Sequence, residues 1–241
     1  MNTQEHEGLK GAALVCLSGG QDSTFCLYWA KSRWKHVAAV TFQYHQIHWR
    51  ELSAAQRVAG LADVPARILD IPALAVIGGG ALTSFDIKGD KPHPQFQELP
   101  GSFVPLRNLI LFSTAAAYAL KLGVPNLVVG VSQTDYSGYP DCRQTFIDHL
   151  TATIQVALGK SEPPIQIWTP LMHLSKSEMV KRARRLPGVW TAWAYTHTCY
   201  RNEFPPCGRC QACELRAVGF EEAGEVDPLV QRMESREPKD V

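Results

Sequence analysis

The sequence contains no long apolar run. None of its stretches approaches the ~20 consecutive apolar residues that a membrane-spanning helix needs. The polar start, MNTQEHEGLKG, has neither the basic beginning nor the apolar stretch of a secretory signal. We therefore expect a cytoplasmic protein that makes no membrane contact.

An excess of charge of one sign is also missing. Lys and Arg number 24 against 23 Asp and Glu, which leaves a net charge of +1. Proteins dedicated to nucleic acids carry a strongly basic surface, so we expect no nucleic-acid partner. Hydrophobic residues make up 45% of the 241 residues and charged residues 20%, which is the balance of a folded chain with a packed core.

Cysteines are few, and their odd number, seven, does not suit a disulfide framework. Four gather near the end of the chain in the spacing C-x₇-C-x₂-C-x₂-C: Cys199, Cys207, Cys210 and Cys213. Four thiolates so spaced can surround one ion tetrahedrally, and the expected ion is Zn²⁺ in a closed structural site. An iron–sulfur cluster and disulfides are the alternatives. We expect Cys16 and Cys26 in the core, and the role of Cys142 stays open.

Short apolar runs alternate with amphipathic stretches along the chain. The runs predict strands over residues 12–17, 36–42, 66–71, 126–131 and 165–168. The intervening stretches predict helices over residues 22–32, 47–61, 106–122, 144–158 and 174–185. Such alternation indicates an α/β fold with a doubly wound, mostly parallel sheet.

A glycine-rich loop, Ser-Gly-Gly-Gln-Asp-Ser at residues 18–23, joins the first strand to the first helix. Open α/β sheets bind ligands at this place, and Gly19 and Gly20 let backbone N–H groups approach an anion. Ser18 and Ser23 add hydroxyl donors, and Asp22 either caps the helix or holds Mg²⁺. The pattern is neither GxxxxGK[ST] nor G-x-G-x-x-G. A plain glycine turn is the other reading.

Two regions stand outside the alternation. Residues 78–104 form a long irregular segment, of a kind that often serves as a lid. Residues 196–241 hold the clustered cysteines. We expect a nucleotide-binding domain over residues 1–195 and a zinc-binding segment over residues 196–241, packed on the same domain.

Polar side chains follow several strands and begin later helices. Residues 135–143 (D-Y-S-G-Y-P-D-C-R) either hold a planar heterocycle between aromatic rings or form an ordinary surface loop. Residues 44–50, with Tyr44, Gln46, His48 and Arg50, either line the site or begin a solvated helix. Arg107 and Asn108 open a helix at its anion-binding end. Lys176 approaches a phosphate or is solvated, and the basic run at 181–185 is expected to be a solvated face.

The loop at 18–23 resembles the SGGxDS signature of N-type ATP pyrophosphatases, which have the adenine nucleotide alpha hydrolase-like fold. Further motifs are P-x-R-N at 105–108, the 135–143 stretch, P-L-x₃-S-K at 170–176 and the T-C-Y…C-G-x-C-x-x-C ending. With the loop, they resemble the QueC family of queuosine biosynthesis, the 7-cyano-7-deazaguanine synthases, over most of the chain. The family's F-D-Y-G-Q-R-H is matched at residues 42–48 except at Gln43, His45 and Ile47.

The resemblance implies a carbon–nitrogen ligase that uses ATP and Mg²⁺. It would adenylate 7-carboxy-7-deazaguanine, form the amide with ammonia, and use a second ATP to make the nitrile. It also implies a homodimer that keeps the structural zinc.

The resemblance implies three sets of site residues. The implied ATP-binding residues are Leu17, Ser18, Gly19, Gly20, Gln21, Asp22, Ser23, Thr24, Phe25, Cys26 and Leu27. The implied catalytic residues are Asp22, Ser23 and Lys176. The implied substrate-binding residues are Tyr44, Gln46, Arg107, Asn108, Asp135, Ser137, Tyr139, Asp141 and Arg143.

Two other functions compete with this interpretation. One is an enzyme of the same superfamily with another acceptor, such as a tRNA thiolase, a lysidine synthase or a QueC-like enzyme that adenylates a different carboxylate. The other is a zinc-dependent nucleic-acid-binding module, which the near-neutral charge and the phosphate loop both disfavour.

Overall fold

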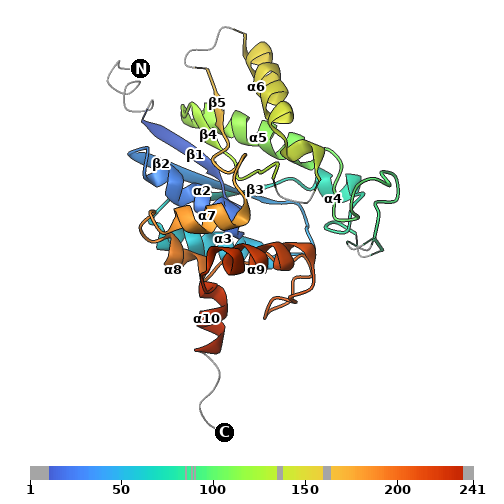
Figure 1. Ribbon diagram of the computed structural model, residues 1–241. Coiled ribbons are helices and arrows are strands. Elements are labelled where there is room, and N and C mark those ends of the chain that lie inside the picture. Colours follow the sequence, from blue (N-terminus) through green and yellow to red (C-terminus); the bar gives the residue numbers. More distant parts are fainter. Residues whose placement is uncertain are drawn as a thin grey trace.

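The computed structural model describes residues 11–84, 86–87, 89, 91–134, 138–159 and 164–235. Within them five strands form one sheet in the order β3-β2-β1-β4-β5, and every neighbouring pair is parallel. The strands are β1 (Ala12–Cys16), β2 (His36–Gln43), β3 (Ala66–Asp70), β4 (Asn126–Val128) and β5 (Gln166–Trp168). The expected α/β fold with a parallel sheet is confirmed (Figure 1).

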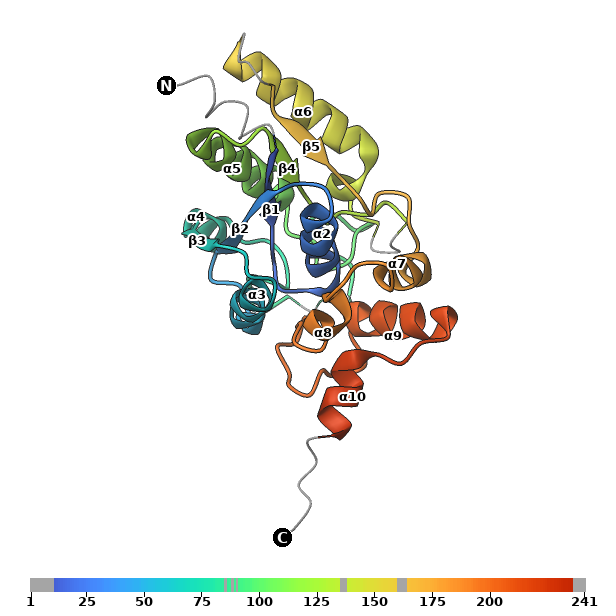
Figure 2. The ribbon, with the colours of Figure 1, turned by 90° about the vertical axis from the view of Figure 1, so that its left-hand side faces the viewer.

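Helices cover both faces of this sheet (Figure 2). On one face lie α2 (Gln21–Lys31), α3 (Arg50–Leu61), α7 (Lys176–Ala183) and α8 (Val189–Trp193). On the other face lie α4 (Ala73–Ile77), α5 (Arg107–Leu122) and α6 (Gln144–Leu158). The remaining helices are η1 (Pro140–Cys142), α9 (Gln211–Ala223) and α10 (Pro228–Glu234). The sheet is therefore doubly wound, as the alternation of strands and helices predicted.

β1 shows why its sequence is apolar throughout. Ala13 and Val15 belong to the core on the α2 face, whereas Ala12 and Leu14 belong to the core on the α5 face. Successive side chains of a strand point to opposite faces. A strand covered on both faces consequently has no position for a polar side chain.

Helix α3 begins three residues later than expected. The chain leaves β2 in a tight loop in which His45 has a positive φ of 55°. The side chain of Gln46 holds that loop, since its Oε1 accepts from the Tyr44 N–H and its Nε2 donates to the Phe42 carbonyl. Residues 44–48 are thereby kept at the end of the sheet rather than wound into the helix.

Helix α7 begins with a capping box. Ser175 accepts a hydrogen bond from the Glu178 N–H, and the Glu178 carboxylate accepts one from the Ser175 N–H. This reciprocal cap fixes the first turn of α7. Lys176 is the first residue of that turn, so the cap also fixes the backbone position from which the lysine side chain extends.

Helix α9 packs along α7 and completes one core. Phe220 of α9 is buried with Trp193 of α8 and Met179 of α7. The two helices approach each other closely at Gly219. A Cβ added to this glycine would lie 2.6 Å from the Lys176 Cβ. Among the described residues no helix is both long and apolar enough to cross a membrane.

Candidate active site

A cavity of about 280 Å³ opens at the carboxyl ends of β1, β2 and β4. The strand order runs one way from β1 to β3 and the other way from β4 to β5, so the cavity lies where the winding of the sheet reverses. Loops after these strands and the start of α7 bring distant residues together there. Its polar lining includes Ser18, Gln21, Asp22, Ser23, Tyr44, Gln46, His48, Glu51, Arg107, Asn108, Ser132, Tyr139, Lys176, Thr198, Tyr200 and Arg216.

The phosphate loop, residues 18–23, is held by its own serines. The Ser23 hydroxyl accepts from the Ser18 N–H at 3.1 Å and lies 3.0 Å from the Ser18 hydroxyl. Gly20 is the N-cap of α2 and no side chain caps the helix. The N–H groups of the first turn of α2 therefore face the cavity, as an anion site requires.

At Gly19 the backbone of the loop lies in close contact with α3. Its φ is +92°, and a Cβ there would lie 2.3 Å from the Glu51 carbonyl oxygen. Only glycine combines this conformation with so close a contact. The loop is thus pressed against the start of α3.

The residues expected to bind ATP divide into three sets. Leu17, Ser18, Gly20, Gln21, Asp22 and Ser23 line the cavity. Gly19 packs on α3. Thr24, Phe25, Cys26 and Leu27 are buried inside α2 and are not among the lining residues. This last set supports the loop from behind rather than facing the cavity.

An ion pair joins the phosphate loop to α7. Lys176 Nζ lies 2.7 Å from both carboxylate oxygens of Asp22. The Lys176 side chain is 14% exposed and that of Asp22 30%. A carboxylate for a metal ion and an ammonium for phosphate oxygens are thus side by side at the loop.

Arg107 is surrounded by three tyrosines, Tyr44, Tyr139 and Tyr200, which we call the tyrosine wall. Burial alone would lower the pKa of Arg107, but Tyr44, together with the carboxylate of Asp141, outweighs it and raises the pKa. Burial raises the pKa of each phenol in the wall. A permanent cation is thus bordered by neutral aromatic rings, which suits an aromatic ligand that carries a carboxylate.

Residues 91–104, the last part of the irregular segment at 78–104, support the tyrosine wall. The Ser102 hydroxyl lies 2.6 Å from the Tyr139 hydroxyl, and the ring of Phe103 lies 5.7 Å from the Tyr139 ring. Phe103 in turn contacts His93 and Phe96. The segment therefore carries a small aromatic core that fixes Tyr139. The expectation that it opens as a lid stays a prediction.

The remaining residues expected to bind substrate lie in different places. Asn108 lines the cavity, and its Nδ2 donates to the Asp141 carbonyl. Asp141 is buried behind the cavity, where it accepts the Asn108 N–H at the start of α5, and burial raises its pKa. Arg143 is exposed and outside the lining. Asp135 and Ser137 lie outside the described residues.

Several lining residues were not identified from the sequence. Glu51 lies in the first turn of α3, and Arg216 is buried in α9. Tyr200 directly follows Cys199, so the cysteine motif was the only sequence feature that pointed to its place in the cavity. His48, which the sequence left undecided, is buried in the lining, whereas Arg50 is exposed.

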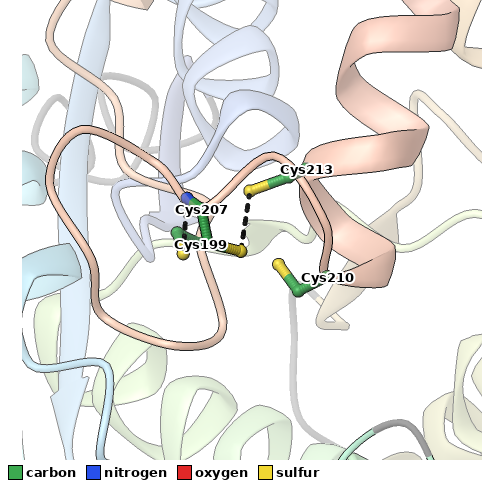
Figure 3. A group of neighbouring side chains, drawn as sticks. All are labelled: Cys199, Cys207, Cys210 and Cys213. Carbon is green, nitrogen blue, oxygen red and sulfur yellow. Dashed lines mark hydrogen bonds between the residues drawn. The ribbon is translucent and has the colours of Figure 1, made fainter.

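The four clustered cysteines converge on one point (Figure 3). Their sulfur atoms all lie within 4.8 Å of one another: Cys199, Cys207, Cys210 and Cys213. A tetrahedral Zn–S₄ centre with bonds of about 2.3 Å places its sulfurs about 3.8 Å apart, so the cluster fits zinc. Two ligands lie at the N-terminal end of α9, where the helix dipole favours thiolates.

Residues 196–235, which carry the clustered cysteines and which we call the cysteine segment, are hydrogen-bonded to the phosphate loop. The His197 N–H donates to the Gly19 carbonyl at 3.0 Å. Arg216 donates to the Thr196 hydroxyl at 2.7 Å and to both carboxylate oxygens of Asp227. Because Thr198 and Tyr200 line the cavity, the residues around the cysteine cluster form part of the same site.

The family model described as "QueC: Queuosine biosynthesis protein QueC" matches residues 12–224. The chain belongs to the QueC family. This assignment covers the phosphate loop, the tyrosine wall and the cysteine cluster together.

Relatives agree with the QueC assignment over nearly their full lengths. The 7-cyano-7-deazaguanine synthase of Chromobacterium violaceum is 48% identical over 225 residues, which are 92% of this chain and 94% of that protein. The enzyme of the same name from Laribacter hongkongensis is 47% identical over 221 residues, 92% of this chain and 95% of that protein. That of Parabacteroides distasonis is 42% identical over 212 residues, 87% of this chain and 93% of that protein.

Proposed function

We propose that this protein is a 7-cyano-7-deazaguanine synthase. It converts 7-carboxy-7-deazaguanine and ammonia into the nitrile at the cost of two ATP molecules. The observation that carries the proposal is a single cavity that is lined both by the phosphate loop and by Arg107 within its tyrosine wall. Membership of the QueC family and the name of its relatives support the same activity.

The chemistry needs activation because a carboxylate has no good leaving group. ATP binds with its phosphates on the N–H groups of residues 18–23, and the substrate carboxylate attacks the α-phosphorus. Lys176 stabilises the charge of the departing pyrophosphate, and Asp22 would hold a Mg²⁺ ion that neutralises the same charge. The protein contributes mainly positioning and charge stabilisation at this step.

The acceptor end of the cavity orients the heterocycle. Arg107 attracts the carboxylate of the substrate, and the neutral phenols of Tyr44, Tyr139 and Tyr200 stack on or donate to the ring system. Asp141 holds the start of α5 in place instead of touching the base. The same groups hold the amide for the second adenylation.

The cysteine cluster takes zinc as a structural ion in this proposal. Bound zinc crosslinks Cys199 and Cys207 to the start of α9 and leaves no position open for a substrate. Residues 196–241 then form a zinc-binding segment on the nucleotide-binding domain of residues 1–195. We further propose a cytoplasmic homodimer that binds no nucleic acid.

The test is conversion by the purified protein. Incubation with 7-carboxy-7-deazaguanine, ammonium and Mg-ATP is expected to give the nitrile by mass spectrometry, with two AMP and two pyrophosphate per product. Omission of ammonium should leave only adenylation. Absence of both amide and nitrile, with activity on another carboxylate or on tRNA, would favour a different member of the superfamily.

A further inference from the structure

The proposed reaction releases protons as well as AMP. Ammonia that attacks the acyl adenylate carries a surplus proton on nitrogen, and the amide must lose both of its N–H protons to become a nitrile. A proton acceptor within reach of the acyl carbon is therefore required. Each titratable side chain that lines the cavity is a candidate for this role.

Most titratable groups of the described lining are unsuited to accept a proton. Both oxygens of Asp22 are bonded to Lys176. The phenols of the tyrosine wall are neutral, and burial raises the pKa of Cys16 to about 12. The Cys142 sulfur faces Asn108 and Asp141. Arginine and lysine are already protonated, which leaves His48 and Glu51.

These two side chains form a pair at the junction of the two halves of the site. His48 Nε2 lies 3.3 Å from Glu51 Oε2. The His48 ring lies between Tyr44 and Tyr200, with both centroid distances 6.4 Å. The Glu51 backbone meets the phosphate loop at Gly19. The pair therefore borders both the phosphates and the tyrosine wall.

The contact with Glu51 accounts for only one of the two ring nitrogens of His48. The Glu51 carboxylate favours the tautomer with its proton on Nε2. His48 Nδ1 is buried and has no hydrogen-bond partner among the residues that the structure describes. Buried polar atoms are nearly always bonded, so an unbonded ring nitrogen beside a cavity points to a bound group.

We propose that His48 and Glu51 are the proton-accepting pair of this site, a role that rests on the proposed function. In amide formation, the ammonia nitrogen bonds to the acyl carbon, the C–O bond to AMP breaks with its electron pair on AMP, and the surplus proton passes to His48. In nitrile formation, His48 takes the first N–H proton of the adenylated amide, releases it to water and then takes the second. The electron pair of that last N–H bond forms the third C–N bond, and the C–O bond to AMP breaks with its electron pair on AMP. Glu51 stabilises the imidazolium each time and His48 returns the proton to water.

The test separates adenylation from the later steps in three variants. His48→Gln removes the base, Glu51→Gln removes its partner, and His45→Asn is the control because His45 is exposed on the same loop with a φ that Asn tolerates. The first assay is ATP–pyrophosphate exchange that depends on 7-carboxy-7-deazaguanine, without ammonium. The second follows amide from the acid, and nitrile from supplied amide.

We expect His48→Gln to keep exchange at the wild-type rate while amide and nitrile formation fall by about a hundredfold. Glu51→Gln should also keep exchange at the wild-type rate, with a smaller loss of amide and nitrile formation. His45→Asn should match the wild type in both assays. Equal loss of exchange and of the later steps in both pair variants, or no loss at all, would overturn the assignment. A wild type that exchanges pyrophosphate but makes neither amide nor nitrile would contradict the proposed function itself.

Discussion

At the scale of single residues, the site depends on contacts between positions far apart in the sequence. Asp22 and Lys176 are 154 positions apart, yet they meet at hydrogen-bond distance. The sequence identified each as a candidate, because one follows a buried strand and the other lies near the start of a predicted helix. It gave no sign that they touch, since this depends on how α2 and α7 are placed relative to each other.

The first prediction concerns this lysine. Lys176→Met removes the ammonium beside the phosphate loop while keeping much of the aliphatic stem. We expect adenylation to slow by about 10²–10³-fold, because a donor aimed at developing charge is lost. Lys181→Met on the exposed side of the same helix is the control. Pyrophosphate release measures both, and equal rates in the two variants would refute the role given to Lys176.

The second prediction concerns the support of the tyrosine wall. Ser102→Ala removes the partner of the Tyr139 hydroxyl. The loss of one buried hydrogen bond costs about 1 kcal/mol, so KM for the carboxylate should rise about fivefold while KM for ATP stays unchanged.

Tyr139→Phe provides the matching half of a double-mutant cycle. Tyr139→Phe removes the bond to Ser102 and also the one to Tyr200, so the double variant should lose little more than Tyr139→Phe alone. Additive losses would mean that Ser102 and Tyr139 act independently.

At the scale of elements, local patterns predicted the sheet and the helices that cover it. β1 is apolar because both of its faces are covered, and the capping box of Ser175 and Glu178 is complete within four residues. Helices α8, α9 and α10 were not predicted. α9 carries charges around much of its surface, and its burial comes from contacts with α7 through Gly219 and Phe220. Such contacts leave no periodic signal in the sequence.

The third prediction compares two helical glycines. Gly219→Ala forces α9 away from Lys176, and we expect a loss of about 1–3 kcal/mol in the free energy of unfolding together with slower adenylation. Gly60→Ala in α3 meets no atom within 4 Å. It should instead stabilise the protein by about 0.4–1 kcal/mol. Thermal unfolding measures both, and a stabilised, fully active Gly219→Ala would contradict the close packing of α7 and α9.

At the scale of the whole molecule, the fold brings the cysteine segment to the phosphate loop. The sequence predicted the cluster from its spacing alone, but not that Thr198 and Tyr200 would line the cavity. The position of Tyr200 depends on the turn that carries the metal ligands. The metal should therefore affect both stability and activity.

The fourth prediction is a change of metal content. Wild-type protein should contain about one zinc per chain. Cys207→Ser should lose the metal, melt at a lower temperature and lose nitrile formation. Cys142→Ser should keep its zinc, since Cys142 lies outside the cluster. Elemental analysis and thermal unfolding decide the matter. A stable Cys207→Ser protein with full zinc would exclude a structural metal.

The hydrogen bond from His197 to Gly19 has a consequence for synthesis on the ribosome. The phosphate loop is translated early, and its own serines and α3 support it, but the hydrogen bond to the Gly19 carbonyl comes from a residue translated more than 170 positions later. A nascent chain that still lacks the cysteine segment therefore lacks one of the contacts that fix the loop. We expect such a chain to bind ATP less well than the finished protein does.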